Sequence, residues 1–334
     1  MIDMARPVKQ VQLGRTGQSS SHLGLGFGAW PFKVTYAEFL EVVHTALESG
    51  IRHLDVSPLY STEELLGRAL ADLQAPNDIF LSTKACAYRD DIGIEYQEYS
   101  GRTVMASVRR SLKQLNVDTL DCVHIHDPLP EHLDQIYGKG GALECLRALR
   151  DQEVIDSIGM ATVDLDCLDS AIDCGEFDHI QFFHTYTLLN QQATEKVIPK
   201  AKAKNLSVLN SGPQAGFILA TGPGPDACYN YRPASGEVMA AATRIQAICD
   251  RKGVPMGTAA LAYSLQCPDI DVTVVAAESP ARIMECLAAY RTSLTADDFE
   301  EMISAAGGPY PVSSCHEGNP WFSGPWEKIP EHME

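Results

Sequence analysis

The chain has 334 residues, of which 45% are hydrophobic and 21% are charged, a composition typical of a globular protein with a large core. Its formal net charge of −18 at pH 7 argues against nucleic acid and anionic membrane surfaces as partners, because both are polyanionic. No apolar run approaches the roughly 20 residues needed to cross a bilayer, and the N-terminus lacks the apolar stretch of a signal peptide, so we expect a cytoplasmic protein.

Short β-rich runs alternate with amphipathic helical stretches along the chain. Strands are predicted at 23–27, 52–56, 79–83, 120–126, 155–159, 179–183, 206–210 and 271–275. Helices are predicted at 37–49, 62–74, 102–115, 141–153, 165–174, 190–204, 235–252 and 281–290. Strands separated by helices form parallel βαβ units, and eight successive units favour a closed (β/α)8 TIM barrel over an open sheet. We therefore expect residues 1–334 to form one α/β barrel domain.

Local signals refine this prediction. Gly50 stands where a helix C-cap glycine belongs, and Thr62 precedes EELLGRAL as a predicted N-cap. The segment VKQVQLGRTGQSS before the first strand predicts a short hairpin that plugs the barrel floor. Three stretches lack a regular period and are predicted to be long loops: 90–101, 221–236 and the tail 309–334. We expect part of the tail to wall the substrate pocket.

Four polar residues follow three successive predicted strands. Asp55 lies near the end of the second strand, and Tyr60 follows five residues later. Lys84 ends the third strand, and His126 ends the fourth. Active sites of α/β barrels lie at the carboxyl ends of the strands, and neighbouring strands are about 4.8 Å apart. Each residue alone also has a structural interpretation, but together they are expected to converge at one mouth.

The chemistry of these side chains fits proton transfer. A free tyrosine has a pKa near 10, too high for a good base at neutral pH. An ammonium group beside it favours the phenolate, and a carboxylate fixes that ammonium group. We therefore predict Tyr60 as the general acid/base, Lys84 as the group that lowers its pKa and Asp55 as the partner of Lys84. His126 is predicted to hydrogen-bond the reacting oxygen. Such proton transfer is half of a hydride-transfer reaction, whose hydride must come from a cofactor.

The segments that carry these residues resemble the aldo-keto reductase family. RHLDVSPLYSTEELLGRAL is similar to its segment around the catalytic aspartate and tyrosine, and STKA and DTLDCVHIHDP are similar to its lysine and histidine segments. The resemblance extends from VQLGRTG to about residue 305. DVSPLY, HIHDP and WFSGPW resemble most the L-galactose, L-fucose and D-threo-aldose 1-dehydrogenases.

This resemblance implies an NAD(P)-dependent dehydrogenase that oxidises the hemiacetal hydroxyl of an aldose to a lactone. The related pyridoxal 4-dehydrogenase, which oxidises the hemiacetal form of pyridoxal, and a general aldehyde or ketone reductase are the alternatives. The substrate is thus expected to be a small sugar or aldehyde, and the protein a monomer or a small homo-oligomer.

The resemblance also implies a cofactor site. Gln181 matches the family's carboxamide-binding glutamine, whereas its Ser-Asn pair falls on Ala161 and Thr162, and its stacking aromatic falls near Ser211. The adenosine-binding segment corresponds to VVAAESPARIMECLAAY, in which the common lysine is replaced by Ala276. The predicted cofactor contacts are Thr162, Gln181, Ser211, Gly212, Pro213, Ala276, Glu278, Arg282 and Glu285.

The same segment bears on the choice of cofactor. A 2′-phosphate needs a nearby cation, whereas a free ribose hydroxyl tolerates a carboxylate. Ala276 lacks the cation and Glu278 adds a negative charge, although Arg282 remains. We therefore predict NAD, with NADP as the alternative.

Other motifs suggest rival interpretations. GLGFG (24–28) lacks the third glycine of a Rossmann fingerprint, and we interpret it as first-strand backbone. His124 and His126 share one strand face, and with His53 and His184 they are the basis of a metal-dependent hydrolase hypothesis. The fifth predicted strand offers no ligand, so we expect no metal. A non-catalytic protein of the same fold is the third hypothesis, but none of the four candidate catalytic residues is lost.

Overall fold

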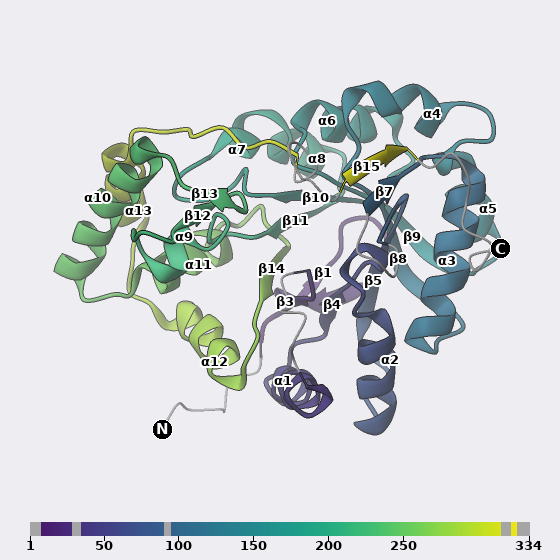
Figure 1. Cartoon of the computed structure of the whole chain (residues 1–334), viewed down its shortest axis with the longest axis horizontal. Coiled ribbons are helices and arrows are strands. Elements are labelled where there is room, and N and C mark those ends of the chain that lie inside the picture. Colours follow the sequence, from purple (N-terminus) through teal and green to yellow (C-terminus); the bar gives the residue numbers. More distant parts are fainter. Residues whose placement is uncertain (1–7, 29–34, 90–94, 315–321, 326–334) are drawn as a thin grey trace.

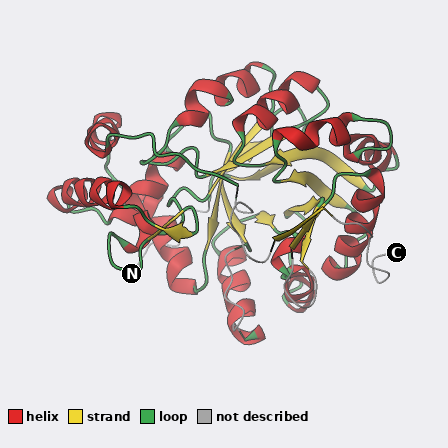
Figure 2. Cartoon of the chain, turned by 45° about the horizontal axis from the view of Figure 1, so that its top comes forward, coloured by secondary structure: helices red, strands yellow, loops and turns green. Residues whose placement is uncertain are grey.

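Eight parallel strands close into a barrel at the centre of the molecule (Figures 1 and 2). In a computed structural model, residues 8–28, 35–89, 95–314 and 322–325 are described. In chain order the barrel strands are β3 (Leu23–Gly26), β4 (His53–Asp55), β5 (Phe80–Ala85), β8 (Leu120–His126), β9 (Ile155–Ala161), β10 (His179–Phe183), β11 (Ser207–Ser211) and β14 (Val272–Ala276). β14 pairs with β3 and closes the barrel, so the (β/α)8 prediction is confirmed.

Helices surround the barrel (Figure 2). The longer ones are α1 (Tyr36–Glu48), α2 (Glu63–Asp72), α3 (Gly101–Leu115), α5 (Ala142–Asp151), α6 (Leu165–Cys174), α8 (Ile198–Ala203), α10 (Gly236–Lys252), α11 (Met256–Leu265), α12 (Pro280–Ala288) and α13 (Ala296–Ala306). Short turns are η1 (Pro58–Tyr60), α4 (Leu133–Tyr137), η2 (Pro130–His132), α7 (Gln192–Lys196), α9 (Ile218–Thr221) and η3 (Ala289–Arg291). No helix in these described segments is both long and apolar enough to cross a membrane.

The helix predictions fail at three places, each for a physical reason. The predicted helix 190–204 is two helices, α7 and α8, because Pro199 lacks the N–H that a continuous helix needs and instead occupies the first turn of α8. Helix α11 was not predicted, because it is buried on most sides and therefore shows almost no amphipathic period. Helix α13 was not predicted either, although Thr295 and Asp298 form a capping box at its start.

The two predicted caps have different outcomes. Gly50 follows α1 with φ +84°, the left-handed conformation that glycine adopts without strain. Thr62 precedes α2 as predicted, but its hydroxyl makes no capping bond and is buried without a hydrogen-bond partner among the described residues. Here Ser61, with φ +56°, ends η1 and leads directly into α2, so Thr62 already has helical backbone angles.

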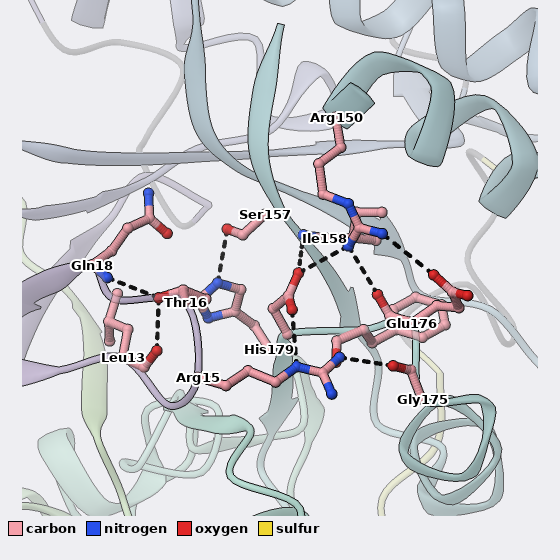
Figure 3. Close-up of polar contacts among 12 residues, drawn as sticks. Leu13, Arg15, Thr16, Gln18, Arg150, Ser157, Ile158, Gly175, Glu176 and His179 are labelled. Atoms are coloured by element: carbon pink, nitrogen blue, oxygen red, sulfur yellow. Dashed lines mark hydrogen bonds and ion pairs between the residues drawn. The ribbon is translucent and has the colours of Figure 1, made fainter. Parts of the chain in front are cut away.

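The predicted N-terminal hairpin closes the barrel floor. β1 (Gln10–Gln12) pairs antiparallel with β2 (Ser19–Ser21), and Leu13 in the turn is fully buried against barrel-lining side chains that include Phe80 and Leu209. Arg15 fixes this turn, because its Nε lies 3.1 Å from Oδ1 of Asp178 and its Nη2 donates to the carbonyl oxygens of residues 175 and 177 (Figure 3). Arg15 therefore joins the hairpin at the barrel floor to the segment that leads into β10.

A layer of histidines fills the barrel above this floor. His53, His124 and His179 are fully buried on β4, β8 and β10, each two residues before a residue of the mouth. We call these three the histidine layer. Branched aliphatic residues are the usual filling of such barrels. Burial lowers the pKa of His53 and His179 to about 4 and holds the pKa of His124 well below its ordinary value, so the layer is neutral at pH 7.

All three predicted loops contain regular structure. β6 (Ala87–Arg89) and β7 (Glu95–Gln97) form a hairpin, and β15 (Phe322–Pro325) from the tail pairs with β7 (Figure 1). β12 (Cys228–Tyr229) and β13 (Arg232–Pro233) form a second hairpin in the loop after β11. The prediction that 90–101 and the tail are irregular throughout was wrong, because these segments supply each other's backbone hydrogen-bond partners. Residues 90–94, 315–321 and 326–334 of these loops lie outside the described residues.

Candidate active site

A buried ion pair lies at the carboxyl ends of β4 and β5. Nζ of Lys84 is 2.8 Å from both carboxylate oxygens of Asp55 and donates to the carbonyl oxygen of Val56 at 3.1 Å. Oδ1 of Asp55 also accepts a hydrogen bond from Ser82 at 2.8 Å. Burial alone would raise the pKa of Asp55, but the charge of Lys84 and its hydrogen bond to the carboxylate, with a smaller contribution from the neighbouring His124, outweigh it and lower the pKa to about 2. Asp55 is therefore a carboxylate that fixes the Lys84 ammonium group.

Tyr60 lies beside this pair. It ends the short turn η1, which Ser57 caps and Pro58 begins, and Ser61 follows in the left-handed conformation. Nζ of Lys84 is 5.1 Å from the centroid of the Tyr60 ring. Gly28 packs against the same ring, since a Cβ atom there would lie 3.0 Å from its Cζ. The ring thus contacts Gly28, which follows strand β3, and lies near the Lys84 ammonium group.

His126 completes the group from the end of β8. Its ring meets that of Tyr60 edge-on, with centroids 5.8 Å apart at 87°. Its Nδ1 is 3.3 Å from the Ser57 hydroxyl, and its carbonyl oxygen accepts a hydrogen bond from the buried Tyr99 hydroxyl at 2.9 Å. The structure therefore brings together all four residues predicted from the strand ends. Ser57 and Tyr99, which hold His126, were missed by the sequence analysis.

Gln181 on β10 joins this group to the opposite side of the mouth. Its Nε2 donates to Oδ2 of Asp55 at 3.1 Å and to the Ser211 hydroxyl at 2.7 Å. Its Oε1 is buried without a hydrogen-bond partner among the described residues. A carboxamide N–H, such as that of nicotinamide, is a donor that this oxygen can accept. The residues present thus fit a nicotinamide beside Tyr60 and Lys84.

Comparison with known proteins identifies the family. The model of the aldo/keto reductase family matches residues 24–306. This chain belongs to the aldo/keto reductase family. The reductase is 30% identical to L-galactose dehydrogenase of Arabidopsis thaliana, over 83% of this chain and 86% of that relative. It is 28% identical to D-threo-aldose 1-dehydrogenase of a Pseudomonas species, over 73% and 80% of the two chains. It is 25% identical to pyridoxal 4-dehydrogenase of Microbacterium luteolum, over 88% and 96%.

Solved structures agree on the fold. An aldo-keto reductase from Bacillus halodurans superposes with a TM-score of 0.75 at 23% identity, over 92% of this chain and 98% of that one. Glycerol dehydrogenase from Gluconobacter oxydans superposes with a TM-score of 0.73 at 20% identity, over 91% and 97%. The family match shows that the protein is an NAD(P)-dependent oxidoreductase that acts on small carbonyl compounds.

The loop after β11 and the start of α12 carry the other predicted cofactor contacts of the reductase. Gly212 has φ +64°, and a Cβ atom there would lie 2.7 Å from the His184 ring, so this close approach requires glycine. Pro213 follows and is buried. Nη2 of Arg282 donates to Oε1 of Gln214 in this loop at 3.2 Å, and Nη1 of Arg282 pairs with Glu285. These contacts bring the two segments together.

Two further predicted contacts lie near α12. Ala276 ends β14 half-buried, directly opposite Gly26 on the first strand of the barrel. Glu278, two residues later, is exposed to solvent. The short apolar side chain at 276 and the carboxylate at 278 thus both lie between the barrel mouth and the first turn of α12.

Thr162 is used differently from the prediction. It is fully buried, and its hydroxyl lies 3.1 Å from Oδ1 of Asp127 and 3.0 Å from the carbonyl oxygen of Pro128. The other carboxylate oxygen of Asp127 accepts a hydrogen bond from Ser314 at 2.9 Å. Asp127 follows His126 directly in the chain, so its hydrogen bond with Ser314 links the tail to the barrel mouth. Because these bonds hold the Thr162 hydroxyl inside the protein, we do not include it among the proposed cofactor contacts.

The described part of the tail also walls a cavity of about 580 Å³ at this end of the reductase. The cavity lies between the loops after β8, β9 and β10 and the tail residues 312–314. Asp164 and Glu195 are among its lining residues. The four candidate catalytic residues, Asp55, Tyr60, Lys84 and His126, are not. The tail therefore shapes the surface beside the mouth.

The geometry gives no support to a metal centre in the reductase. The histidine-layer residue His124 is pressed against Gly159, where a Cβ atom would lie 2.1 Å from its Nδ1. His126 shares its Nδ1 with Ser57, and His184 shares its Nδ1 with Asn230 at 2.9 Å. In the segments that the structure describes, no three His, Cys, Asp or Glu side chains gather so that they could hold a metal ion.

Proposed function

We propose that this reductase oxidises the hemiacetal hydroxyl at C1 of an aldose to a lactone, with NAD as cofactor. The observation that carries the proposal is the position of the Lys84 ammonium group, which contacts the Asp55 carboxylate and faces the Tyr60 ring at 5.1 Å. A buried cation at that position favours the phenolate form of a tyrosine. Tyr60 then has the basicity to take a proton from a hydroxyl at neutral pH.

The reaction divides between the chain and its cofactor. Tyr60 takes the proton of the C1 hydroxyl, and the electron pair of that O–H bond forms the new carbonyl bond. His126 hydrogen-bonds the same oxygen and holds it beside Tyr60. Asp55 keeps Lys84 in place, and Gln181 presents its free Oε1 to the carboxamide. Bound NAD supplies the acceptor for the hydride that leaves C1.

The charges near α12 support NAD over NADP. Glu278 is exposed and would repel a 2′-phosphate, and Ala276 offers no cation. Arg282 is engaged with Glu285 and with Gln214, so its charge is already partly compensated. The cofactor contacts proposed here are Gln181, Ser211, Gly212, Pro213, Ala276, Glu278, Arg282 and Glu285.

The relatives support an aldose as the substrate. Two of them, L-galactose dehydrogenase and D-threo-aldose 1-dehydrogenase, are named for oxidation of sugars, and each matches more than two thirds of this chain. Pyridoxal 4-dehydrogenase matches 88% of this chain, which keeps pyridoxal as the second candidate substrate. A cyclic sugar and cyclic pyridoxal both present a hemiacetal hydroxyl, so the same proton transfer serves either.

An absorbance assay for reduced nicotinamide tests the proposal. Purified protein is mixed with L-galactose, L-fucose, D-threo-aldoses or pyridoxal, first with NAD and then with NADP. We expect the highest kcat/KM with an aldose and NAD. Turnover of pyridoxal but of no aldose would make pyridoxal the substrate in place of an aldose. Reduction of simple aldehydes without sugar oxidation would contradict the proposed dehydrogenase activity.

Tyr60→Phe tests the mechanism in the same assay. It removes one oxygen atom, so NAD binding should persist while kcat falls by about 10²- to 10⁴-fold. Tyr137→Phe is the matched control, because among the described residues the Tyr137 hydroxyl has one hydrogen bond, which it accepts from Ser170 in the outer helices. Near-normal kcat in Tyr60→Phe, with NAD bound, would remove Tyr60 from the mechanism.

A further inference from the structure

Ser57 lies fully buried between the Asp55–Lys84 pair and His126, and its hydroxyl has two partners. The backbone N–H of Leu59 donates to the Ser57 hydroxyl at 3.1 Å, which caps the turn that carries Tyr60. The second partner is Nδ1 of His126 at 3.3 Å. A hydroxyl has one proton to donate and two lone pairs that accept. The direction of the second bond therefore decides the state of the His126 ring.

The hydrogen bond from Leu59 limits the direction of the hydrogen bond between Ser57 and His126. Since Leu59 is the donor, it uses one lone pair of Ser57 and leaves the hydroxyl proton to be placed. Among the described residues, Nδ1 of His126 is the only acceptor within hydrogen-bond distance of this hydroxyl. A fully buried hydroxyl proton without an acceptor is costly. The Ser57 hydroxyl therefore donates to Nδ1, and Nδ1 accepts.

We propose that Ser57 is a positioning residue that fixes His126 as the Nε2–H tautomer, so that His126 acts as a hydrogen-bond donor to the reacting oxygen. In a neutral imidazole one nitrogen accepts and the other carries the proton, so acceptance at Nδ1 places the proton on Nε2. The inference rests on the proposed function, because that function supplies the oxygen. It adds which atom of His126 is the donor and which residue fixes it there.

The backbone on both sides holds this pair in place. Val56, before Ser57, accepts a hydrogen bond from Lys84 Nζ, and the buried Tyr99 hydroxyl donates to the carbonyl oxygen of His126. One short segment, residues 55–60, thus contributes the partner of Lys84, the serine that orients His126, and the acid/base. The spacing of DVSPLY therefore couples the proton acceptor Tyr60 to the hydrogen-bond donor His126.

Nitrogen-15 NMR of the full chain at pH 8, with and without NAD, reads the tautomer directly. The His126 signals are identified as those lost in His126→Asn. We expect an unprotonated Nδ1 and a protonated Nε2 in the unmodified protein. A protonated Nδ1 overturns the proposal. This readout does not depend on turnover, so its result is independent of the Tyr60→Phe test of the proposed function.

Variants then test the role of the serine. Ser57→Ala should let the His126 ring populate both tautomers and lower kcat by about 3- to 10-fold, the worth of one hydrogen bond, with the Kd for NAD unchanged. Ser57→Thr keeps the hydroxyl and should restore both the Nε2–H tautomer and kcat. Thr295→Ala removes a helix cap in α13, outside the barrel, and is the control for capping alone. Unchanged kcat in Ser57→Ala despite a mixed tautomer, or the same loss of kcat in Thr295→Ala, overturns the proposal.

Discussion

Acidification from pH 7 to pH 5 probes the histidine layer inside the barrel. His53 and His179 have a pKa of about 4 in the folded protein, against an ordinary value of 6.5, because burial disfavours the charged ring. Below pH 6.5 these two histidines therefore bind protons in the unfolded chain but stay neutral in the folded barrel. Stability from this source is present above pH 6.5 and is lost as the pH falls toward 4.

The size of the loss follows from these shifts. Between pH 7 and pH 5, each histidine shifted this far removes about 2 kcal/mol from the free energy of unfolding. His53 and His179 together remove about 4 kcal/mol, and His124, whose pKa is also lowered by burial, adds to this loss. Domains are typically stable by about 5–15 kcal/mol, so we expect the protein to lose a large part of its stability between pH 7 and pH 5.

Urea unfolding followed by circular dichroism at pH 7, 6 and 5 measures this loss. His53→Gln should reduce the difference between pH 7 and pH 5 by about 2 kcal/mol, whatever its effect at pH 7. His44→Gln is the control, because His44 is exposed on α1. A free energy of unfolding that changes by less than about 1 kcal/mol between pH 7 and 5, or an equal effect of both variants, would refute the reasoning.

Four further predictions concern the mouth and the cofactor. Lys84→Met leaves the Asp55 charge buried alone and should cost about 3–5 kcal/mol in urea unfolding at pH 7, and adding Asp55→Asn should recover most of it; no recovery would contradict the buried charge. Gly159→Ala places a Cβ atom 2.1 Å from His124 Nδ1 and should lower Tm by several degrees in a thermal melt, whereas an unchanged Tm would show that the ring moves freely. Glu278→Lys should raise kcat/KM for NADP relative to NAD by about 3- to 10-fold. An unchanged ratio would show that Glu278 does not act on the 2′ position of the cofactor ribose. Prolonged dialysis against EDTA should leave activity intact, and a loss that zinc restores would revive the hydrolase hypothesis.

The sequence predicts those parts of the site that depend on strands. Asp55, Lys84 and His126 are the last inward-facing residues of neighbouring strands, and the barrel architecture alone brings them together. Tyr60 could be placed because its loop is short. Ser57, by contrast, stands in the same motif and was not singled out, since its bond to His126 depends on two loops meeting in space.

The predictions failed where neighbours in space override local pattern. Thr62 has the residue type of an N-cap, but Ser61 has already turned the chain, and the Thr62 hydroxyl makes no capping hydrogen bond in α2. Thr162 was predicted as a cofactor contact from its position in the family pattern, and that role stays a prediction; its hydrogen bond to Asp127 had no signal in the sequence. β15 has no strand signal of its own among glycines and prolines, and its partner β7 lies over two hundred positions earlier in the chain.

Closure of the barrel by β3 and β14 has a consequence for folding during synthesis. β3 is made first and β14 last among the barrel strands, so one edge of β3 lacks its partner until nearly the whole barrel has left the ribosome. Ribosomes add about 5–20 residues per second, which makes this wait on the order of ten seconds or longer. An unpaired strand edge is a site for wrong pairing. The early hairpin β1–β2 and the β4 strand beside it are then the elements available to hold β3 until β14 arrives.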